Sequence, residues 1–377
     1  MFLLPNNLDD VAKLFIHNHK LCELSINLDI NNFIINIRSN SSELLEYCQY
    51  YFSEIVIESL VVKADIEILA IERDNLEFDI DYKDWVRDGN KKGRKDSYYD
   101  FYSEINGVAT GAQARILRKV RTGMVFLQSQ EFLIAAGECL NNKSQLINFI
   151  NTQYMNKVQN QSAVICHAAG LVYKNSAIAM AGFSGGGKST LMLHMLHQDG
   201  SKFLSNDRLF ITKDGNKTMA SGIPKQPRVN PGTIVHNTKL YHLLSSSKRH
   251  EILSMPVSEL WDLEEKYDVM IEQCYGVDRV QYQAEIKNFV VLNWDRKSQY
   301  AVQLVKINLQ QRRDLLAAIM KSPGPFYQSS SGEMYQYQQQ LDEQKYLHAF
   351  ADINVYEARG GIDFHALSRL CYERFFL

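Results

Sequence analysis

The spacing of apolar residues divides the chain into two parts. In residues 1–150, helical spacing over 7–21 and 41–52 alternates with strand-like runs over 22–30, 33–38 and 61–72. Asn31 and Asn32 provide a turn between the first two runs, and Ser41 provides a cap for the second helix. This alternation predicts a smaller α+β domain over residues 1–150, which is a candidate for partner binding.

Residues 151–377 are expected to form a second domain, of the α/β class. Its predicted core, residues 162–236, begins with an apolar strand over 162–173, a tight turn at Lys174–Asn175 and a strand over 176–181. Helical spacing follows over 189–197, and another apolar strand covers 202–211. The other segments are expected to form scaffold: strands near 289–296 and 353–357, helices over 146–158 and 310–321, and a final helix capped by Asp363.

A glycine-rich loop lies between the strand over 176–181 and the helix that follows. Its sequence, Gly182-Phe-Ser-Gly-Gly-Gly-Lys-Ser189, satisfies the phosphate-loop (Walker A) pattern G-x-x-x-x-G-K-[ST]. Glycines let backbone N–H groups converge on a phosphate, and a helix that begins at the lysine directs its positive end at the same anion. The lysine then contacts the outer phosphates, and the serine hydroxyl coordinates magnesium.

The strand–loop–helix context disfavours a glycine-rich turn that binds no ligand. We therefore predict a site for ATP and Mg²⁺. The predicted nucleotide-binding residues are Gly182, Ser184, Gly185, Gly186, Gly187, Lys188, Ser189 and Thr190.

Polar residues occur within two of the predicted core strands. Asn206, Asp207 and Arg208 interrupt the strand over 202–211, and polar groups in a buried strand are costly unless something satisfies them. A parallel sheet delivers the ends of neighbouring strands to one edge, so we expect Asp207 beside the phosphate loop, as a catalytic group and a magnesium ligand. His167 lies in the strand over 162–173, where a single histidine is more often structural than functional.

Composition excludes several classes of function. The 377 residues are 45% hydrophobic and have a formal net charge of −2, which disfavours general nucleic-acid binding. No apolar run approaches the ~18 residues of a membrane span, and the first residues do not resemble a secretory signal. Six scattered cysteines without a C-x-x-C pair indicate reduced thiols rather than disulfides or zinc. We expect a cytoplasmic protein that contacts neither membrane nor nucleic acid.

Two basic stretches lie in the first domain, at residues 87–95 and 115–123. The first combines lysine, arginine and glycine, as in a mobile loop that meets phosphate or an acidic partner. A solvated hairpin tip is the simpler interpretation. The second stretch is expected to form the positive face of a strand or short helix. Neither pattern specifies a chemistry.

The order of these motifs resembles the catalytic domain of the HPr kinase/phosphorylase family. The resemblance rests on His167-Ala-Ala-Gly170, the glycine loop, Phe203-Leu-Ser-Asn-Asp-Arg208 and the stretch Pro224-Lys-Gln-Pro-Arg-Val-Asn-Pro-Gly232. It covers residues 162–236 and is closest to the HPr-kinase-related kinases of type B, which also have a preceding N-terminal domain. The implied fold is a P-loop kinase domain of the HPr kinase/PEP carboxykinase-like type.

The resemblance also implies an activity: an ATP-dependent serine/threonine protein kinase that acts on an unidentified protein partner and forms a homo-oligomer. It assigns phosphate and magnesium binding to Lys188 and Ser189. It assigns acceptance of the substrate hydroxyl proton to Asp207 and an active-site role to His167.

Two positions depart from the family pattern. Asn206 stands where the family has the first acid of an aspartate pair, and Arg228 stands near the family's metal-binding glutamate. The loss of these carboxylates argues against the phosphorylase half of the family's activity. Asn206 and Arg228 become candidates for a phosphate or substrate contact instead.

Other nucleotide-dependent functions remain open. A transporter-type ATPase requires an L-S-G-G-Q stretch and a GTPase requires N-K-x-D, and neither motif occurs. A small-molecule kinase or carboxykinase-like enzyme on the same fold shares the site chemistry, because loops select the acceptor. A nucleotide-dependent regulatory module without turnover is the alternative from another class, and the combination of Lys188, Ser189 and Asp207 argues against it.

Overall fold

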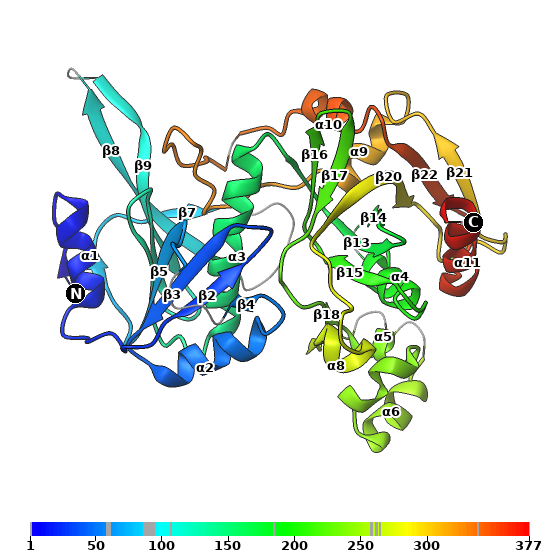
Figure 1. The fold of residues 1–377 in the computed structure, drawn as a ribbon, viewed down its shortest axis with the longest axis horizontal. Helices are drawn as coiled ribbons and strands as arrows, with labels where there is room; N and C mark the ends of the chain where they lie inside the picture. The colour runs from blue at the N-terminus through cyan, green and yellow to red at the C-terminus, as the bar shows by residue number, and fades with distance from the viewer. Residues whose placement is uncertain are drawn as a thin grey trace. The chain divides into compact units, whose positions relative to one another are not determined.

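The computed structural model describes residues 2–376 except 58–61, 86–94, 106–107, 184, 257–258, 261–262, 264 and 338. The basic stretch at 87–95 therefore lies outside the described residues apart from Lys95. The chain forms two compact units (Figure 1). Unit 1 comprises Met1–Asn160 and Pro323–Gln340, and unit 2 comprises Gln161–Ser322 and Leu341–Leu377.

This division differs from the predicted boundary at residue 150 in two ways. Helix α3 (Lys143–Asn160) belongs to unit 1, whereas its sequence was expected to lead into the second domain. The chain also returns to unit 1 over residues 323–340, because these residues pack on side chains of the first part of the chain.

Unit 1 contains a nine-stranded sheet of order β4-β2-β3-β5-β11-β10-β9-β8-β7, in which the β3–β5 and β5–β11 pairs are parallel. The strands are β2 (Ile26–Asp29), β3 (Ile34–Ser39), β4 (Val56–Ile57), β5 (Ile66–Glu72), β7 (Lys83–Trp85), β8 (Asp96–Ile105), β9 (Val108–Lys119), β10 (Val125–Gln128) and β11 (Leu133–Gly137). A separate parallel pair joins β1 (Phe2–Leu3) to β6 (Phe78–Asp79). Besides α3, the helices of this unit in the described residues are α1 (Leu8–Ile16) and α2 (Ser42–Tyr51).

Local signals predicted several of these elements. Asn31 and Asn32 both have positive φ, as a two-residue hairpin turn between β2 and β3 requires. The side chain of Ser41 accepts a hydrogen bond from the backbone N–H of Leu44 and so caps α2. Both features confirm the sequence-based prediction.

A fully buried ion pair attaches residues 323–340 to the sheet of unit 1. Arg115, in β9, donates from Nε to Asp100 Oδ1 at 2.6 Å and from Nη2 to Asp100 Oδ2 at 2.8 Å. Its Nη1 donates to the carbonyl oxygens of Pro325 at 2.8 Å and Tyr335 at 3.0 Å. The guanidinium also lies over the ring of Tyr98, 4.4 Å from its centroid. Arg115 is therefore buried, whereas its sequence context predicted a position on a positive face. Burial is possible because Asp100 neutralises its charge and the protein accepts hydrogen bonds from its N–H groups.

Unit 2 is built on a curled mixed sheet of order β12-β16-β17-β20-β14-β13-β15, with β22 paired to β20 and β21 (Figure 1). Its strands are β12 (Val164–Cys166), β13 (Ala168–Tyr173), β14 (Ser176–Gly182), β15 (Lys202–Ser205), β16 (Leu209–Asp214), β17 (Lys217–Ser221), β20 (Gln283–Leu292), β21 (Gln303–Ile307) and β22 (Asn354–Arg359). A small separate sheet pairs β18 (Arg228–Val229) with β19 (Tyr267–Asp268).

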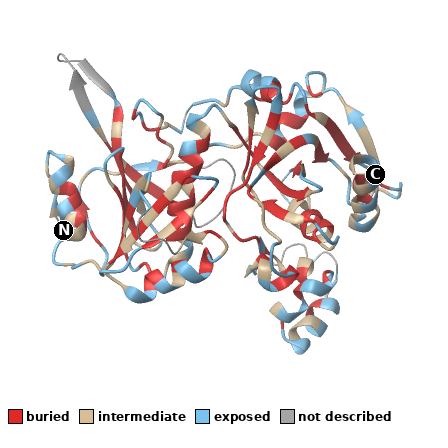
Figure 2. Ribbon diagram, viewed as in Figure 1, coloured by how far each residue is buried: buried red, intermediate tan, exposed pale blue. Residues whose placement is uncertain are grey.

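The helices of unit 2 surround this sheet. In the described residues they are α4 (Lys188–Met195), α5 (Pro231–Val235), η1 (Thr238–Leu243), α6 (Ser246–Leu253), α8 (Ile271–Tyr275), η2 (Arg313–Leu315), α9 (Leu316–Ile319), α10 (Glu343–Ala349) and α11 (Phe364–Phe375). The strands are largely buried, as Figure 2 shows, and their apolar side chains form the core with α9 and α10.

Two predicted strands are each broken into two. The chain over 164–173 runs antiparallel to the chain over 202–214, with β12 on β16 and β13 on β15. The first is broken at His167, whose backbone N–H donates to Ile319 O at 2.6 Å instead of to a strand. The second is broken at residues 206–208, where Asp207 has a left-handed φ of 69°. His167 and Asp207 consequently face each other across a gap in the ladder.

The sheet is mixed, and the parallel sheet expected around the phosphate loop is limited to the β14–β20 and β20–β22 pairs. Strand β13 lies between β14 and β15, so Asp207 does not follow an immediate neighbour of β14 as predicted. However, β15 is antiparallel to β13 and β13 is antiparallel to β14. The carboxyl ends of β14 and β15 and the start of β13 therefore meet at one edge of the sheet.

Disulfides and membrane-spanning helices are absent from the described part of the chain. All six cysteines are free thiols, and all but Cys22 are buried. No helix among the described residues is both long enough and apolar enough to cross a membrane. Five of the six cysteines thus match the interpretation as buried thiols, and Cys22 does not.

The ion pair of unit 1 leads to a stability prediction. Asp100→Asn leaves the Arg115 charge buried without its counter-ion, and we expect it to lower the free energy of unfolding by about 3 kcal/mol. Hydrogen exchange should also become faster in residues 323–340, because their anchor on Arg115 is weakened. Urea denaturation and exchange mass spectrometry would measure both effects. The exposed pair of Asp10 and Lys13 supplies the control, since Asp10→Asn should change neither. Equal stability of both variants would contradict the prediction.

Candidate active site

The loop between β14 and α4 has the backbone form that its glycines predict. Gly185 and Gly187 have φ angles of 74° and 85°, in the left-handed region that favours glycine. Gly187 precedes the first turn of α4, and helix residues begin at Lys188. The free N–H groups of this turn are thus directed toward the loop, as anion binding requires. Ser184 lies outside the described residues.

Side chains that sequence analysis missed hold the loop in place. Trp294 Nε1 donates to Gly186 O at 3.0 Å, and Arg296 Nη2 donates to Gly185 O at 3.4 Å. The Trp294 ring also contacts Phe364 edge to face, with centroids 5.0 Å apart. The sequence signal for these contacts was the run Asn293-Trp-Asp-Arg296, in which polar and aromatic residues directly follow a buried strand. They follow β20, whose last residue is level with Gly182.

The polar side chains of the first helical turn make specific contacts. Lys188 Nζ donates to Gly182 O at 3.1 Å, and Ser189 Oγ donates to Asn206 Oδ1 at 2.6 Å. The Thr190 hydroxyl lies 2.9 Å from that of Thr233. The structure thus brings Ser189 and Asn206 together, although they belong to different predicted motifs.

The Ser189–Asn206 pair fits a magnesium ion that arrives with a nucleotide. Mg²⁺ prefers oxygen ligands and takes several of them from phosphates and water, so the protein need supply only one or two. The Ser189 hydroxyl and the Asn206 amide oxygen are two such donors side by side. Among the described residues, no group of three or more His, Cys, Asp or Glu is arranged to hold a metal. Asp207 directs both carboxylate oxygens elsewhere.

Asp207 lies between a histidine and a lysine. Its Oδ1 is 3.0 Å from His167 Nε2, and its Oδ2 accepts a hydrogen bond from Lys321 Nζ at 2.9 Å. The side chain of Asp207 remains 45% exposed, so solvent or a substrate can still reach the carboxylate. Lys321 follows α9, and no motif around it in the sequence indicated that it belongs to the site. It is brought here because His167 and Cys166 pair with the backbone of residues 319–320.

The surrounding charges set the protonation state of this cluster. Burial raises the pKa of Asp207, but the hydrogen bond with His167 and the charges of Lys321 and Arg208 lower it by more, so the pKa is well below its ordinary value. The hydrogen bond with Asp207 raises the pKa of His167, but burial and the charges of Lys321 and Lys188 lower it by more. At neutral pH the pair is therefore a carboxylate and a neutral imidazole, with the Nε2 hydrogen directed to the carboxylate.

Further cations border the same carboxylate. Burial, followed by the charge of Arg208, lowers the pKa of Lys225 to about 7, and burial lowers the pKa of Lys321 to about 8 although Asp207 opposes the shift. Arg228, predicted as a phosphate or substrate contact, is exposed and forms an ion pair with Asp268 at 3.0 Å. Sequence analysis singled out Arg228 but missed Lys225, three positions earlier.

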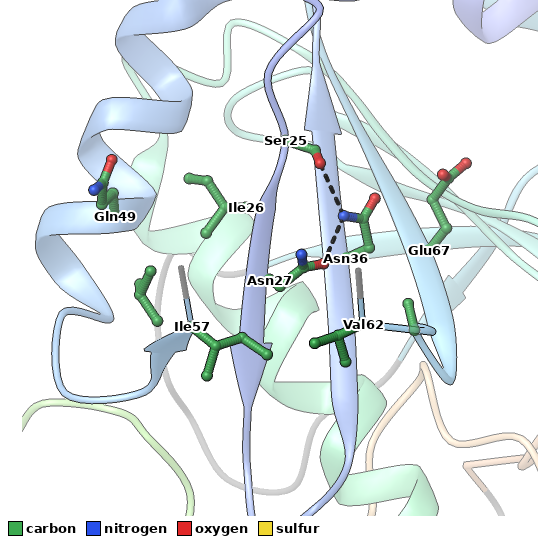
Figure 3. Close-up of a pocket in the computed structure, with 10 residues that line it drawn as sticks. Ser25, Ile26, Asn27, Asn36, Gln49, Ile57, Val62 and Glu67 are labelled. Atoms are coloured by element: carbon green, nitrogen blue, oxygen red, sulfur yellow. Dashed lines mark hydrogen bonds between the residues drawn. The ribbon is translucent and has the colours of Figure 1, made fainter. Parts of the chain in front are cut away.

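Unit 1 contains a hollow of about 320 Å³ that includes none of the predicted site residues (Figure 3). Its floor carries the side chains of Asn27 and Asn36, joined by a hydrogen bond of 2.8 Å, and Asn36 also donates to Ser25 at 3.0 Å. The Asn36 amide N–H groups are thus already used within the protein. The hollow therefore adds no chemistry to the site in unit 2.

No protein-family model and no curated protein matches the chain. Among solved structures, an HPr(Ser) kinase/phosphatase from Coxiella burnetii is similar to this chain, with 12% identity and a TM-score of 0.28. The alignment covers 55% of this chain and 88% of that one. Similarity at this level establishes neither a shared fold nor a shared activity.

The charges around His167 lead to a pH prediction. In an NMR titration, the pKa of His167 should lie below its ordinary value. Lys321→Met should raise this pKa, because it removes a nearby positive charge, whereas Asp207→Asn should lower it further, because it removes the anion that stabilises the imidazolium. Shifts of the same sign in both variants would contradict the described cluster. His250, on α6, serves as a control resonance that neither substitution should move.

Proposed function

We propose that this protein is an ATP-dependent phosphotransferase, a serine/threonine kinase that transfers the γ-phosphoryl group to a hydroxyl of a protein partner. The observation that carries the proposal is the position of the Asp207 cluster at the same sheet edge as the phosphate loop. A loop alone would support only nucleotide binding. A solvent-accessible carboxylate beside it supports transfer to a second molecule, in keeping with the resemblance to HPr-kinase-related kinases.

In the proposed reaction, the acceptor oxygen attacks the γ-phosphorus and the bond to the β–γ bridging oxygen breaks. The hydroxyl proton passes to Asp207, and ADP leaves with the bridging oxygen. A carboxylate of low pKa is a weak base, but a loose phosphoryl-transfer transition state develops little charge on the attacking oxygen before the proton is lost. Asp207 therefore acts mainly by orienting the hydroxyl within about 3 Å.

The other residues of the site have supporting roles in this proposal. His167 and Lys321 fix the two carboxylate oxygens of Asp207, and Lys188 stabilises charge on the outer phosphates. Ser189 and Asn206 would hold magnesium, which neutralises phosphate charge when it is bound with the nucleotide. Trp294 and Phe364 keep the loop glycines in the conformation that nucleotide binding requires.

Nucleotide binding is tested first. Lys188→Ala removes the cation of the loop, and we expect it to weaken the binding of Mg²⁺ and a non-hydrolysable ATP analogue at least ~10-fold. Calorimetry on the full chain would measure this change. Lys174→Ala, in the hairpin turn at the other end of β14, is the matched control and should leave the affinity unchanged. Unchanged affinity in the Lys188 variant would remove the loop from the mechanism.

Transfer is tested at Asp207. Asp207→Asn keeps the shape of the side chain but removes the carboxylate, and we expect a loss of at least ~100-fold in turnover, about 2.7 kcal/mol of barrier. Nucleotide affinity should stay near that of the unmodified chain, because the loop is intact. Incorporation of label from γ-labelled ATP into protein of a lysate would measure transfer. If Asp207→Asn retained near-normal transfer, a nucleotide-dependent regulatory module would become the better interpretation.

A further inference from the structure

The charges around Asp207 do not balance. Several cations interact electrostatically at this edge of the sheet: Arg208 and Lys321 lower the pKa of Lys225, and Arg208 and Lys188 lower the pKa of Lys321. The carboxylate of Asp207 neutralises Lys321, with which it forms an ion pair. Lys188 belongs to the phosphate loop and serves the nucleotide. Arg208 and Lys225 remain without an assigned anion, and Lys225 is only partly protonated at neutral pH because its pKa is about 7.

Neither of these two cations is satisfied by the part of the chain that the structure describes. Arg208 Nε is buried and has no hydrogen-bond partner, and the described residues contain no carboxylate within ion-pair distance of its guanidinium. The Lys225 side chain likewise forms no hydrogen bond or ion pair with the described residues. Both residues are partly buried, and partly buried cations without a partner favour the binding of an anion.

Backbone contacts link the two segments that carry these cations. The hydroxyl of Ser205 donates to Arg208 O and accepts from Ile223 N, so it links the turn after β15 to the segment that carries Lys225. Gly222 lies so close to this strand that a Cβ would overlap the carbonyl oxygen of Leu204. The segments that carry Arg208 and Lys225 are thus held together by the fold.

We propose that Arg208 and Lys225 form a second anion subsite, which binds a phosphate monoester on the acceptor while its hydroxyl lies at Asp207. This inference rests on the proposed phosphotransferase function and specifies its substrate class: an acceptor that already carries a phosphate. The permanently charged guanidinium of Arg208 offers paired donors to the dianion of a phosphate monoester, and the bound dianion would keep Lys225 protonated. Arg228 does not contribute, because Asp268 already neutralises it.

The subsite is tested by calorimetry on the full chain saturated with Mg²⁺ and a non-hydrolysable ATP analogue, so that the phosphate loop is occupied. The probe is O-phospho-L-serine, and L-serine is its uncharged reference. We expect phosphoserine to bind and serine not to bind. Arg208→Gln and Lys225→Gln should each weaken phosphoserine binding about tenfold or more, with nucleotide affinity changed less than about twofold. Lys202→Gln, at the opposite end of β15, is the matched control and should bind both ligands normally.

The outcomes separate this inference from the proposed function. Normal nucleotide binding without phosphoserine binding, or phosphoserine binding that all variants share, would overturn the subsite and leave the phosphotransferase proposal intact. If the nucleotide analogue did not bind, the phosphotransferase proposal would fail. Phosphoserine binding would then be measured in a Lys188→Ala background, which lacks the cation of the phosphate loop. Weaker binding after Arg208→Gln or Lys225→Gln would still support the subsite, and unchanged binding would overturn it. Nucleotide affinity also reports folding of each variant.

A second probe identifies the source of the phosphate. Phosphoserine within a short peptide of uncharged residues is compared with the free amino acid under the same conditions. Equal or tighter binding of the peptide, lost in Lys225→Gln, supports a phosphorylated protein as the acceptor. Binding of the free amino acid alone, with the same loss, supports a phosphorylated small molecule.

Discussion

The carboxylate of Asp207 is the interaction on which the active site of unit 2 depends. It joins the break after β15 to the start of β13 through His167, and to the end of α9 through Lys321. Without this anion, the cations of three segments would repel one another in a half-buried space. The left-handed backbone at Asp207 directs the chain away from the sheet and so places the carboxylate in the gap opposite His167. A strained residue at a functional site is a common arrangement, because the surrounding structure compensates for its cost.

The site is formed where two paired strands are interrupted, rather than on long loops. Hydrogen bonds of β12 on β16 and of β13 on β15 continue on both sides of the interruption, so the polar groups within it have little freedom to move. Such preorganisation suits phosphoryl transfer, in which the protein contributes mainly positioning and charge. The phosphate loop reaches the same edge from β14, which is separated from β15 by β13. Side chains that follow β20, at Trp294 and Arg296, and the ring of Phe364 at the start of α11 then hold its glycines.

Sequence reasoning identified features that depend on a few neighbouring residues. The turns at Asn31–Asn32 and Lys174–Asn175 have the positive φ angles of two-residue hairpins, and Asp363 caps α11 through the N–H of Ala366. The order of strands depends on contacts distant in sequence, so the breaks at His167 and Asp207 were predicted as continuous strands. Lys225 and Lys321 were missed for the same reason. Each is an ordinary lysine near a proline, and only tertiary structure brings it to Asp207.

The passage of residues 323–340 through unit 1 has a consequence for folding during synthesis. The chain moves between the units after residues 160, 322 and 340, so neither unit corresponds to one continuous stretch of the gene. Arg115 obtains its last backbone acceptors from Pro325 and Tyr335, which leave the ribosome after most of unit 2. The N-terminal unit is made first, but it cannot finish folding first. A nascent chain must therefore leave the buried Arg115 site partly unsatisfied for about two hundred residues of translation. A cut at residue 160 would separate unit 1 from its own residues 323–340, which would remain in the fragment that contains unit 2.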